Sequence, residues 1–155
     1  MNRCRIYLAG VGGQGTLFAT MLLAEATLYA GVKVLVNEIH GMAQRGGVVE
    51  STVIVGDIKS SIISDGEADA LIGFEPVETY RALKKCSVDS VVVSNTAPVI
   101  PHGVAIGEEI YPDVDKLLAS VRGQVRELIT LDALALANKA GSILSANIVM
   151  LGAFA

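Results

Sequence analysis

Short apolar segments alternate with glycine-rich or polar ones in the first part of the chain, which predicts strands and helices in turn. Residues 5–9 have the length and apolar content of a buried strand, and residues 16–30 follow a helical period. Gly31 is suited to end that helix, and residues 32–36 form a second, β-branched strand. The order strand, helix, strand predicts a βαβ unit with a right-handed crossover.

The next segment changes character twice. Residues 37–47 have neither a helical nor a strand period, so a long loop is predicted there. Residues 48–63 alternate between apolar and polar positions around Gly56 and Asp57, which is the pattern of an antiparallel hairpin. A hairpin added to a βαβ unit predicts a mixed sheet.

The second half of the chain continues the alternation. Strands are predicted at 70–74 and 90–94, and 104–110 is compatible with another; helices are predicted from Glu75 and Pro76 to 85, at 113–121, from Thr130 to 140, and at 145–155. The pattern predicts one domain, residues 1–155, with a three-layer α/β/α Rossmann-like fold and a mixed, mostly parallel sheet containing one hairpin. The last helix has no stop signal, so it either packs against something or the chain is cut short after Ala155.

The composition of the chain bears on its partners and its location. The chain is 52% hydrophobic with a mean hydropathy of +0.53, yet no apolar run reaches the roughly 18 residues of a membrane span. The excess of apolar surface indicates a partner subunit or a thoroughly buried sheet. A net charge of −4 disfavours nucleic acid, and the first residues lack the apolar core of a signal peptide, so a cytoplasmic location is expected.

Cysteine and histidine are scarce in this sequence. Cys4 and Cys86 are the only cysteines, which is too few for a structural zinc or iron–sulfur site, and we interpret them as reduced thiols in or near the core. His40 and His102 are the only histidines, so a three-histidine site is excluded. If the protein takes part in redox chemistry, the metal is expected on another chain.

The glycine-rich turn after the first strand is the first candidate site. Three of its glycines fit the dinucleotide-binding spacing G-x-G-x-x-G, and the residues expected to hold an anion or a nucleotide are Gly10, Gly12, Gly13, Gln14, Gly15 and Thr16. Glu38, near the end of the second strand, is the candidate partner of a ribose. The same glycines also suit a tight turn with close packing and no ligand, and both interpretations stay open.

A second motif, 40-HGMAQRGG-47, follows shortly after Glu38. Together with 10-GVGGQG-15 and the late 145-SANIVMLGAF-154, it resembles the gamma-type subunit or domain of 2-oxoacid:ferredoxin oxidoreductases, with wording most similar to the indolepyruvate branch. The resemblance covers essentially the whole chain. It implies a small subunit that contributes structure and interface, with no cofactor of its own. It further implies larger partner subunits that carry thiamine diphosphate and iron–sulfur clusters, use CoA, and pass electrons to ferredoxin.

The residues of the second motif are candidates for an interface or the edge of a cofactor. Arg45 can bind a carboxylate or phosphate through two hydrogen bonds, Gln44 adds an amide, and Gly46 and Gly47 let a ligand or partner backbone approach. Alternatively, Arg45 pairs with an acidic neighbour such as Glu38 or Glu50. His40 is interpreted as a neutral packing residue in preference to a catalytic one.

Three further features are weaker candidates. His102 is interpreted as a surface loop residue, Asn147 as a cap or subunit contact, and the acidic group Asp65, Glu67 and Asp69 as a solvated turn. No catalytic residue is predicted in this chain. Two alternatives to the subunit hypothesis remain: a stand-alone NAD(P)- or FAD-binding oxidoreductase, and a nucleotide-sensing module.

Overall fold

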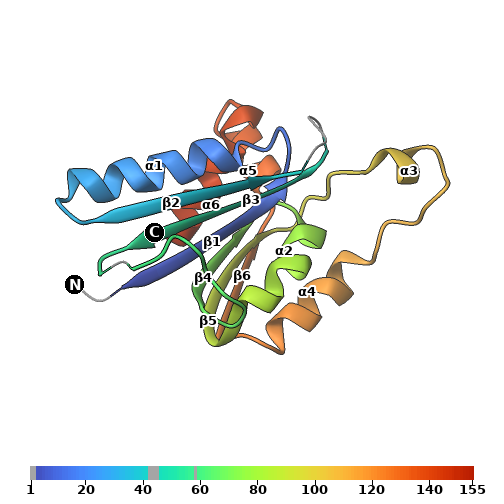
Figure 1. Ribbon diagram of the computed structural model, residues 1–155. Helices are drawn as coiled ribbons and strands as arrows, with labels where there is room; N and C mark the ends of the chain where they lie inside the picture. The colour runs from blue at the N-terminus through green and yellow to red at the C-terminus, as the bar shows by residue number, and fades with distance from the viewer. Residues whose placement is uncertain (1–2, 42–45, 58) are drawn as a thin grey trace.

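The computed structural model describes residues 3–41, 46–57 and 59–155, which fold around one six-stranded sheet (Figure 1). The strands are β1 (Cys4–Val11), β2 (Val34–His40), β3 (Val48–Val55), β4 (Ala68–Gly73), β5 (Cys86–Asn95) and β6 (Glu127–Leu131). The helices are α1 (Thr16–Tyr29), α2 (Pro76–Ala82), α3 (His102–Ala105), α4 (Val114–Arg122), α5 (Ala133–Lys139) and α6 (Ala146–Phe154), with 3-10 turns η1 (Leu83–Lys85) and η2 (Ile143–Ser145). In the described part of the chain, no helix is long and apolar enough to cross a membrane.

The sheet is mixed and mostly parallel, in the order β2-β3-β1-β4-β5-β6. Only β3 runs against its neighbours β1 and β2, while β1, β4, β5 and β6 pair in parallel. Helices α1, α5 and α6 cover one face and α2 and α4 the other (Figure 1). Each face has its own apolar core, because alternate residues of β1 such as Tyr7 and Leu8 point to opposite sides. The predicted fold class is confirmed.

The predicted hairpin exists, but its position was wrong. Its two strands are β2 and β3, and residues 42–45 of the segment between them lie outside the described residues. The prediction placed the turn at Gly56 and Asp57, yet residues 59–63 form no strand, and residue 58 lies outside the described residues. Of that short stretch only Ile63 is buried, so it has no apolar face to pair with. The predicted loop also starts too early, because β2 continues to His40.

Two predictions in the second half were also wrong. Residues 104–110 form the end of α3 and a turn instead of a strand, because the apolar side chains of Ile106 and Ile110 stay exposed and reach no core. The helix predicted to begin at Thr130 begins after Asp132, whose side chain accepts a hydrogen bond from the Ala135 N–H at 2.8 Å. Thr130 belongs to β6, a short edge strand that the pattern did not reveal.

Candidate functional site

The chain connections diverge between β1 and β4. From β1 the chain passes through α1 to β2 on one side of the sheet, and from β4 it passes through α2 to β5 on the other. Open α/β sheets bind ligands in the crevice at the carboxyl ends of the strands where the connections diverge in this way. The glycine-rich turn follows β1 and opens onto this crevice.

The side chain of Gln14 connects the glycine-rich turn to the ends of the strands. Its side-chain oxygen accepts a hydrogen bond from the Val11 N–H at 2.9 Å, and its amide nitrogen donates to the Phe74 carbonyl at 2.8 Å. Phe74 directly follows β4, so one carboxamide bridges the ends of two parallel strands. The glycine-rich turn is therefore fixed to the sheet by a side chain.

Two glycines of this turn, Gly10 and Gly15, are required by packing. A Cβ on Gly10 would lie 2.8 Å from the Thr16 hydroxyl and 2.9 Å from the Gln14 side-chain oxygen. Gly15 has a φ of 75° and precedes α1, and a Cβ there would overlap the Asn147 amide. Asn147 donates from that amide to the Gly15 carbonyl at 3.4 Å. The last glycine of the motif thus makes room for an asparagine on α6.

Some backbone donors of the turn remain available. The Gly12 N–H donates to the Gly47 carbonyl at 2.8 Å, which joins the two sequence motifs. Within the described residues, the N–H groups of Gly13, Gly15 and Thr16 have no acceptor. The Thr16 hydroxyl is buried without a hydrogen-bond partner in the described structure and lies against Gly10, so it does not line the crevice.

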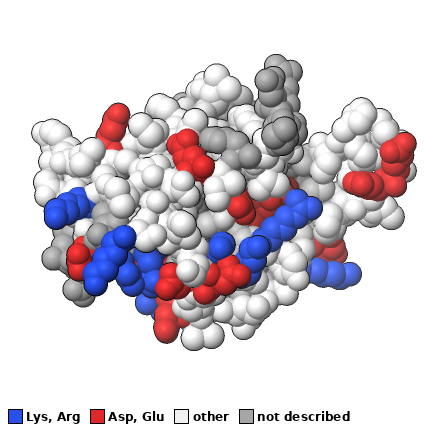
Figure 2. Space-filling model, viewed as in Figure 1, with Lys and Arg blue, Asp and Glu red and all other residues white. Residues whose placement is uncertain are grey.

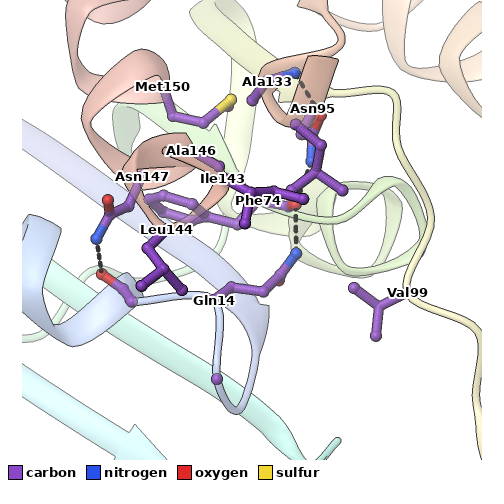
Figure 3. Close-up of a pocket in the computed structure, with 13 residues that line it drawn as sticks. Gln14, Phe74, Asn95, Val99, Ala133, Ile143, Leu144, Ala146, Asn147 and Met150 are labelled. Atoms are coloured by element: carbon purple, nitrogen blue, oxygen red, sulfur yellow. Dashed lines mark hydrogen bonds between the residues drawn. The ribbon is translucent and has the colours of Figure 1, made fainter. Parts of the chain in front are cut away.

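A cavity of about 290 Å³ lies beside the turn, on the side covered by α5 and α6 (Figure 3). Its wall combines the carboxamides of Gln14, Asn95 and Asn147 with apolar side chains, among them Phe74, Leu144 and Met150. Asn95 donates to the Phe74 carbonyl at 3.0 Å and accepts from the Ala133 N–H at 3.0 Å. These amides orient the wall, and none of them is a nucleophile or a general base.

A second cavity, of about 680 Å³, lies between α2 and the segment 99–112. At its wall the buried carboxyl group of Glu75 accepts hydrogen bonds from the Glu78 N–H, the Val99 N–H and the Tyr111 hydroxyl. Burial and this contact raise the pKa of Tyr111. Burial also raises the pKa of Glu78, although Arg81, at 2.6 Å, opposes that shift. Every buried carboxyl group here already has a donor.

The predicted ribose partner lies away from the glycine-rich turn. Glu38 is on β2, and β3 separates β2 from β1. Through Ser51 of β3, Glu38 is level with Leu8, not with the end of β1. Two strand spacings place these backbones about 9.6 Å apart. In a dinucleotide fold the acidic strand is the direct neighbour of the first one, so Glu38 does not occupy the place of a ribose partner.

The structure describes only part of the second motif, 40-HGMAQRGG-47. Its first residue, His40, ends β2, and Gly46 and Gly47 precede β3, beside the glycine-rich turn. Gln44 and Arg45 lie outside the described residues. The exposed His102 begins α3 and lines the second cavity, whereas the acidic group forms ion pairs that connect it to Arg5 and Lys85.

Sequence reasoning missed the part played by Asn95 and Glu75. Asn95 is the last residue of β5, and Glu75 comes after Phe74, which follows β4. A buried polar residue at the carboxyl end of an apolar strand is the signal that would have singled them out. The contact between Asn147 and Gly15 joins residues 132 positions apart, and no local pattern indicates it.

Fold and site together define an α/β module with a carboxamide-lined crevice. The chain belongs to the pyruvate ferredoxin/flavodoxin oxidoreductase family, whose model matches residues 5–155. It is 42% identical over 150 residues to the indolepyruvate oxidoreductase subunit IorB of Methanothermobacter thermautotrophicus, which covers 97% of this chain and 76% of that one. It is 37% identical over 155 residues to the IorB subunit of Pyrococcus horikoshii, with 99% and 77% covered.

Solved structures share the fold. The pyruvate oxidoreductase subunit PORC of Thermotoga maritima matches 98% of this chain and 74% of its own, with a TM-score of 0.68 and 21% identity. The 2-oxoglutarate:ferredoxin oxidoreductase of Magnetococcus marinus matches 98% of this chain with a TM-score of 0.72 and 21% identity, but only 24% of its own chain is covered. The same fold thus also occurs as one part of a much longer chain.

These comparisons confirm the predicted family, the gamma-type subunits of 2-oxoacid:ferredoxin oxidoreductases. The chain is a small oxidoreductase subunit. The alternative of a stand-alone NAD(P)- or FAD-binding oxidoreductase gains no support from these relatives, and the position of Glu38 gives it none either.

Proposed function

We propose that this chain is the small subunit of an indolepyruvate:ferredoxin oxidoreductase. In the overall reaction a 2-oxoacid and CoA yield an acyl-CoA and CO₂, and the two electrons released pass to ferredoxin. The observation that carries the proposal is the 37–42% identity, over nearly the whole chain, to subunits named for indolepyruvate. The wording of the motif at 40–47 supports the same branch.

We also propose that thiamine diphosphate and the iron–sulfur clusters are held by larger partner subunits. Cluster binding needs several thiolates close together. Cys4 is on β1 and Cys86 on β5, two strands away. Burial raises the pKa of both thiols, which disfavours the thiolate that a metal requires. Within the described residues, no three metal-ligating side chains lie together. The residues present therefore do not fit a cluster.

The glycine-rich turn and the second motif are proposed to face the partner at the edge of its cofactor. The Gly12 hydrogen bond to Gly47 holds the two motifs together. The Gly13, Gly15 and Thr16 N–H groups, which have no acceptor among the described residues, would bind an anion such as a phosphate of CoA or thiamine diphosphate. Gln14, Gln44 and Arg45 would supply polar contacts beside them. In this proposal Glu38 and His40 contribute to the interface.

The proposal is tested by producing the chain with its larger subunit and assaying the complex. We expect 2-oxoacid-dependent reduction of ferredoxin with an indolepyruvate kcat/KM at least 10-fold above those for pyruvate, 2-oxoglutarate and 2-oxoisovalerate. A complex that prefers pyruvate would contradict the indolepyruvate assignment and leave the subunit assignment intact. Failure of the two chains to form a complex would contradict both.

A further inference from the structure

We propose that the exposed face of α1, extended by η2, is the docking surface for the larger subunit, and that the partner presents an apolar groove with one basic side chain. This inference rests on the proposed function. The docking surface consists of Leu17, Phe18, Met21, Leu22, Leu28 and Tyr29 of α1, with Ile143 and Leu144 of η2 and Ile148 of α6. Helix α6 contacts both α1 and η2.

Helix α1 has the composition of a buried helix. Its fourteen residues, TLFATMLLAEATLY, contain one charged residue, Glu25, and are apolar on all sides. Such a helix normally lies inside a protein. Here only Thr16, Ala19, Thr20 and Ala24 are buried against the sheet, while Phe18 is 57% and Tyr29 96% exposed. The outward side is therefore as apolar as the side that packs on the core.

The surface is large enough for a stable interface. At ~200 Å² for a fully exposed large side chain, the exposed fractions of the nine residues give an apolar area on the order of 1,000 Å². The largest apolar patch of an ordinary monomer is ~300–600 Å², and one side of a standard protein interface buries ~800 Å². In Figure 2 the surface over α1 is mostly white with one small red area, whereas most charged residues of this view lie in its lower half and at its right.

The surface is continuous with the candidate site. Leu144 is 87% exposed and lines the smaller cavity together with Gly15, which directly precedes α1 (Figure 3). A partner covering α1 and Leu144 would therefore also cover the mouth of this cavity. Docking and the cofactor edge proposed above are then parts of one interface.

The single charge on the helix identifies the kind of partner. Glu25 lies along the midline of the exposed face, between Leu22 and Leu28, and is itself exposed. A symmetric contact between two copies of this chain would bury two Glu25 carboxylates, and α1 offers no basic residue to pair with them. A different chain with a Lys or Arg opposite Glu25 satisfies the carboxylate, which favours the larger subunit over a second copy.

The test compares the affinity of the larger subunit for the wild-type chain and for Phe18→Asp. Phe18 is the third residue of α1, where an acidic side chain suits the helix dipole, so the variant chain should fold normally. We expect its Kd to rise at least ~30-fold, the effect of losing an interface hot spot. The matched control is Val88→Asp, which changes a 74% exposed apolar residue outside the docking surface; its Kd should stay within about 3-fold. Circular dichroism melting of each chain checks folding.

The charge is tested separately. Glu25→Lys should weaken binding more than Glu25→Gln, because only the former places like charges together. Tighter binding by Glu25→Lys would contradict a basic partner side chain.

Equal binding of wild-type chain and Phe18→Asp would overturn the docking surface while the proposed function stands. Cross-links from α1 to a second copy, or to another segment of the same chain, would also overturn it. If the wild-type chain does not bind the larger subunit at all, the proposed function fails first.

Discussion

At the scale of single residues, Gly15 shows why the glycine-rich turn is conformationally demanding. Its φ of 75° favours glycine, and the Asn147 amide occupies the space where a side chain would begin. Gly31, at the other end of α1, has nearly the same φ of 73° but nothing within 4 Å of a Cβ. The two positions separate the cost of the backbone conformation from the cost of the contact.

Gly15→Ala should therefore destabilise the chain more than Gly31→Ala does. The left-handed conformation alone costs about 1–2 kcal/mol at either position, and displacing Asn147 adds about 1 kcal/mol or more at position 15. Urea unfolding followed by circular dichroism measures both variants. In the double variant Gly15→Ala with Asn147→Ala, part of the excess should return. Equal losses at 15 and 31 would show that the Asn147 contact contributes nothing.

Cys86 provides a prediction on pH. Burial raises the pKa of its thiol to about 11. In a Cys4→Ser variant, iodoacetamide should label Cys86 roughly 100-fold more slowly at pH 8 than it labels the urea-unfolded chain, whose thiol has a pKa of ~8.5. The labelling rate should rise until the pH reaches about 11. A midpoint near 8.5 in the folded chain would contradict burial of the thiol.

The raised pKa of Cys86 also determines how the stability of the fold changes with pH. Because the folded pKa is the higher one, the folded chain favours the protonated thiol. This contribution to stability is fully present below the unfolded pKa of ~8.5 and is lost as the pH rises through the folded value. Alkaline conditions should therefore weaken the wild-type fold more than that of Cys86→Ala.

At the scale of elements, Asn95 ties three segments together where β5 ends. It binds the Phe74 carbonyl after β4, the Ala97 N–H in its own loop and the Ala133 N–H at the start of α5. Asn95→Ala leaves buried partners unsatisfied and should cost about 3 kcal/mol of unfolding free energy. The control Asn138→Ala, on the exposed side of α5, should change stability by at most ~0.5 kcal/mol. Faster hydrogen exchange at Ala133 in the first variant would locate the effect, and an unchanged urea midpoint would contradict it.

Elements that bury a regular apolar face could be predicted from sequence. The strand at 5–9, the helix at 16–30 and the helix opened by Glu75 and Pro76 all exist. The pattern failed where apolar residues stay on the surface, as at Ile106 and Ile110, and where an edge strand is half exposed, as in β6. The register of β3 between β1 and β2 depends on long-range pairing, which no local pattern contains.

The candidate site divides in the same way. The sequence reveals the glycine-rich turn, its position between a strand and a helix, and the motif at 40–47. It does not reveal which residues they contact. Gln14 bridges to Phe74, and Gly15 is matched by Asn147, only because the folded sheet brings distant segments to one crevice.

At the scale of the whole molecule, the chain has a fully covered core and a large apolar area on its surface. Both faces of the sheet are covered, yet α1 remains apolar toward the outside, and the cavity beside it is lined by carboxamides and apolar side chains. Such a molecule is suited to work as part of a larger assembly, since permanent subunits have interfaces that resemble a core. Half of the exposed large apolar side chains of the described residues belong to the docking surface on α1, η2 and α6.

The most direct test of the proposed function is to measure indolepyruvate-dependent ferredoxin reduction by the larger subunit, with and without this chain. We predict no turnover by this chain alone, with or without NAD(P), and at least a 10-fold increase in the activity of the larger subunit when the chain is added in equal amount. Full activity of the larger subunit by itself, or nicotinamide-dependent turnover by this chain alone, would contradict the account.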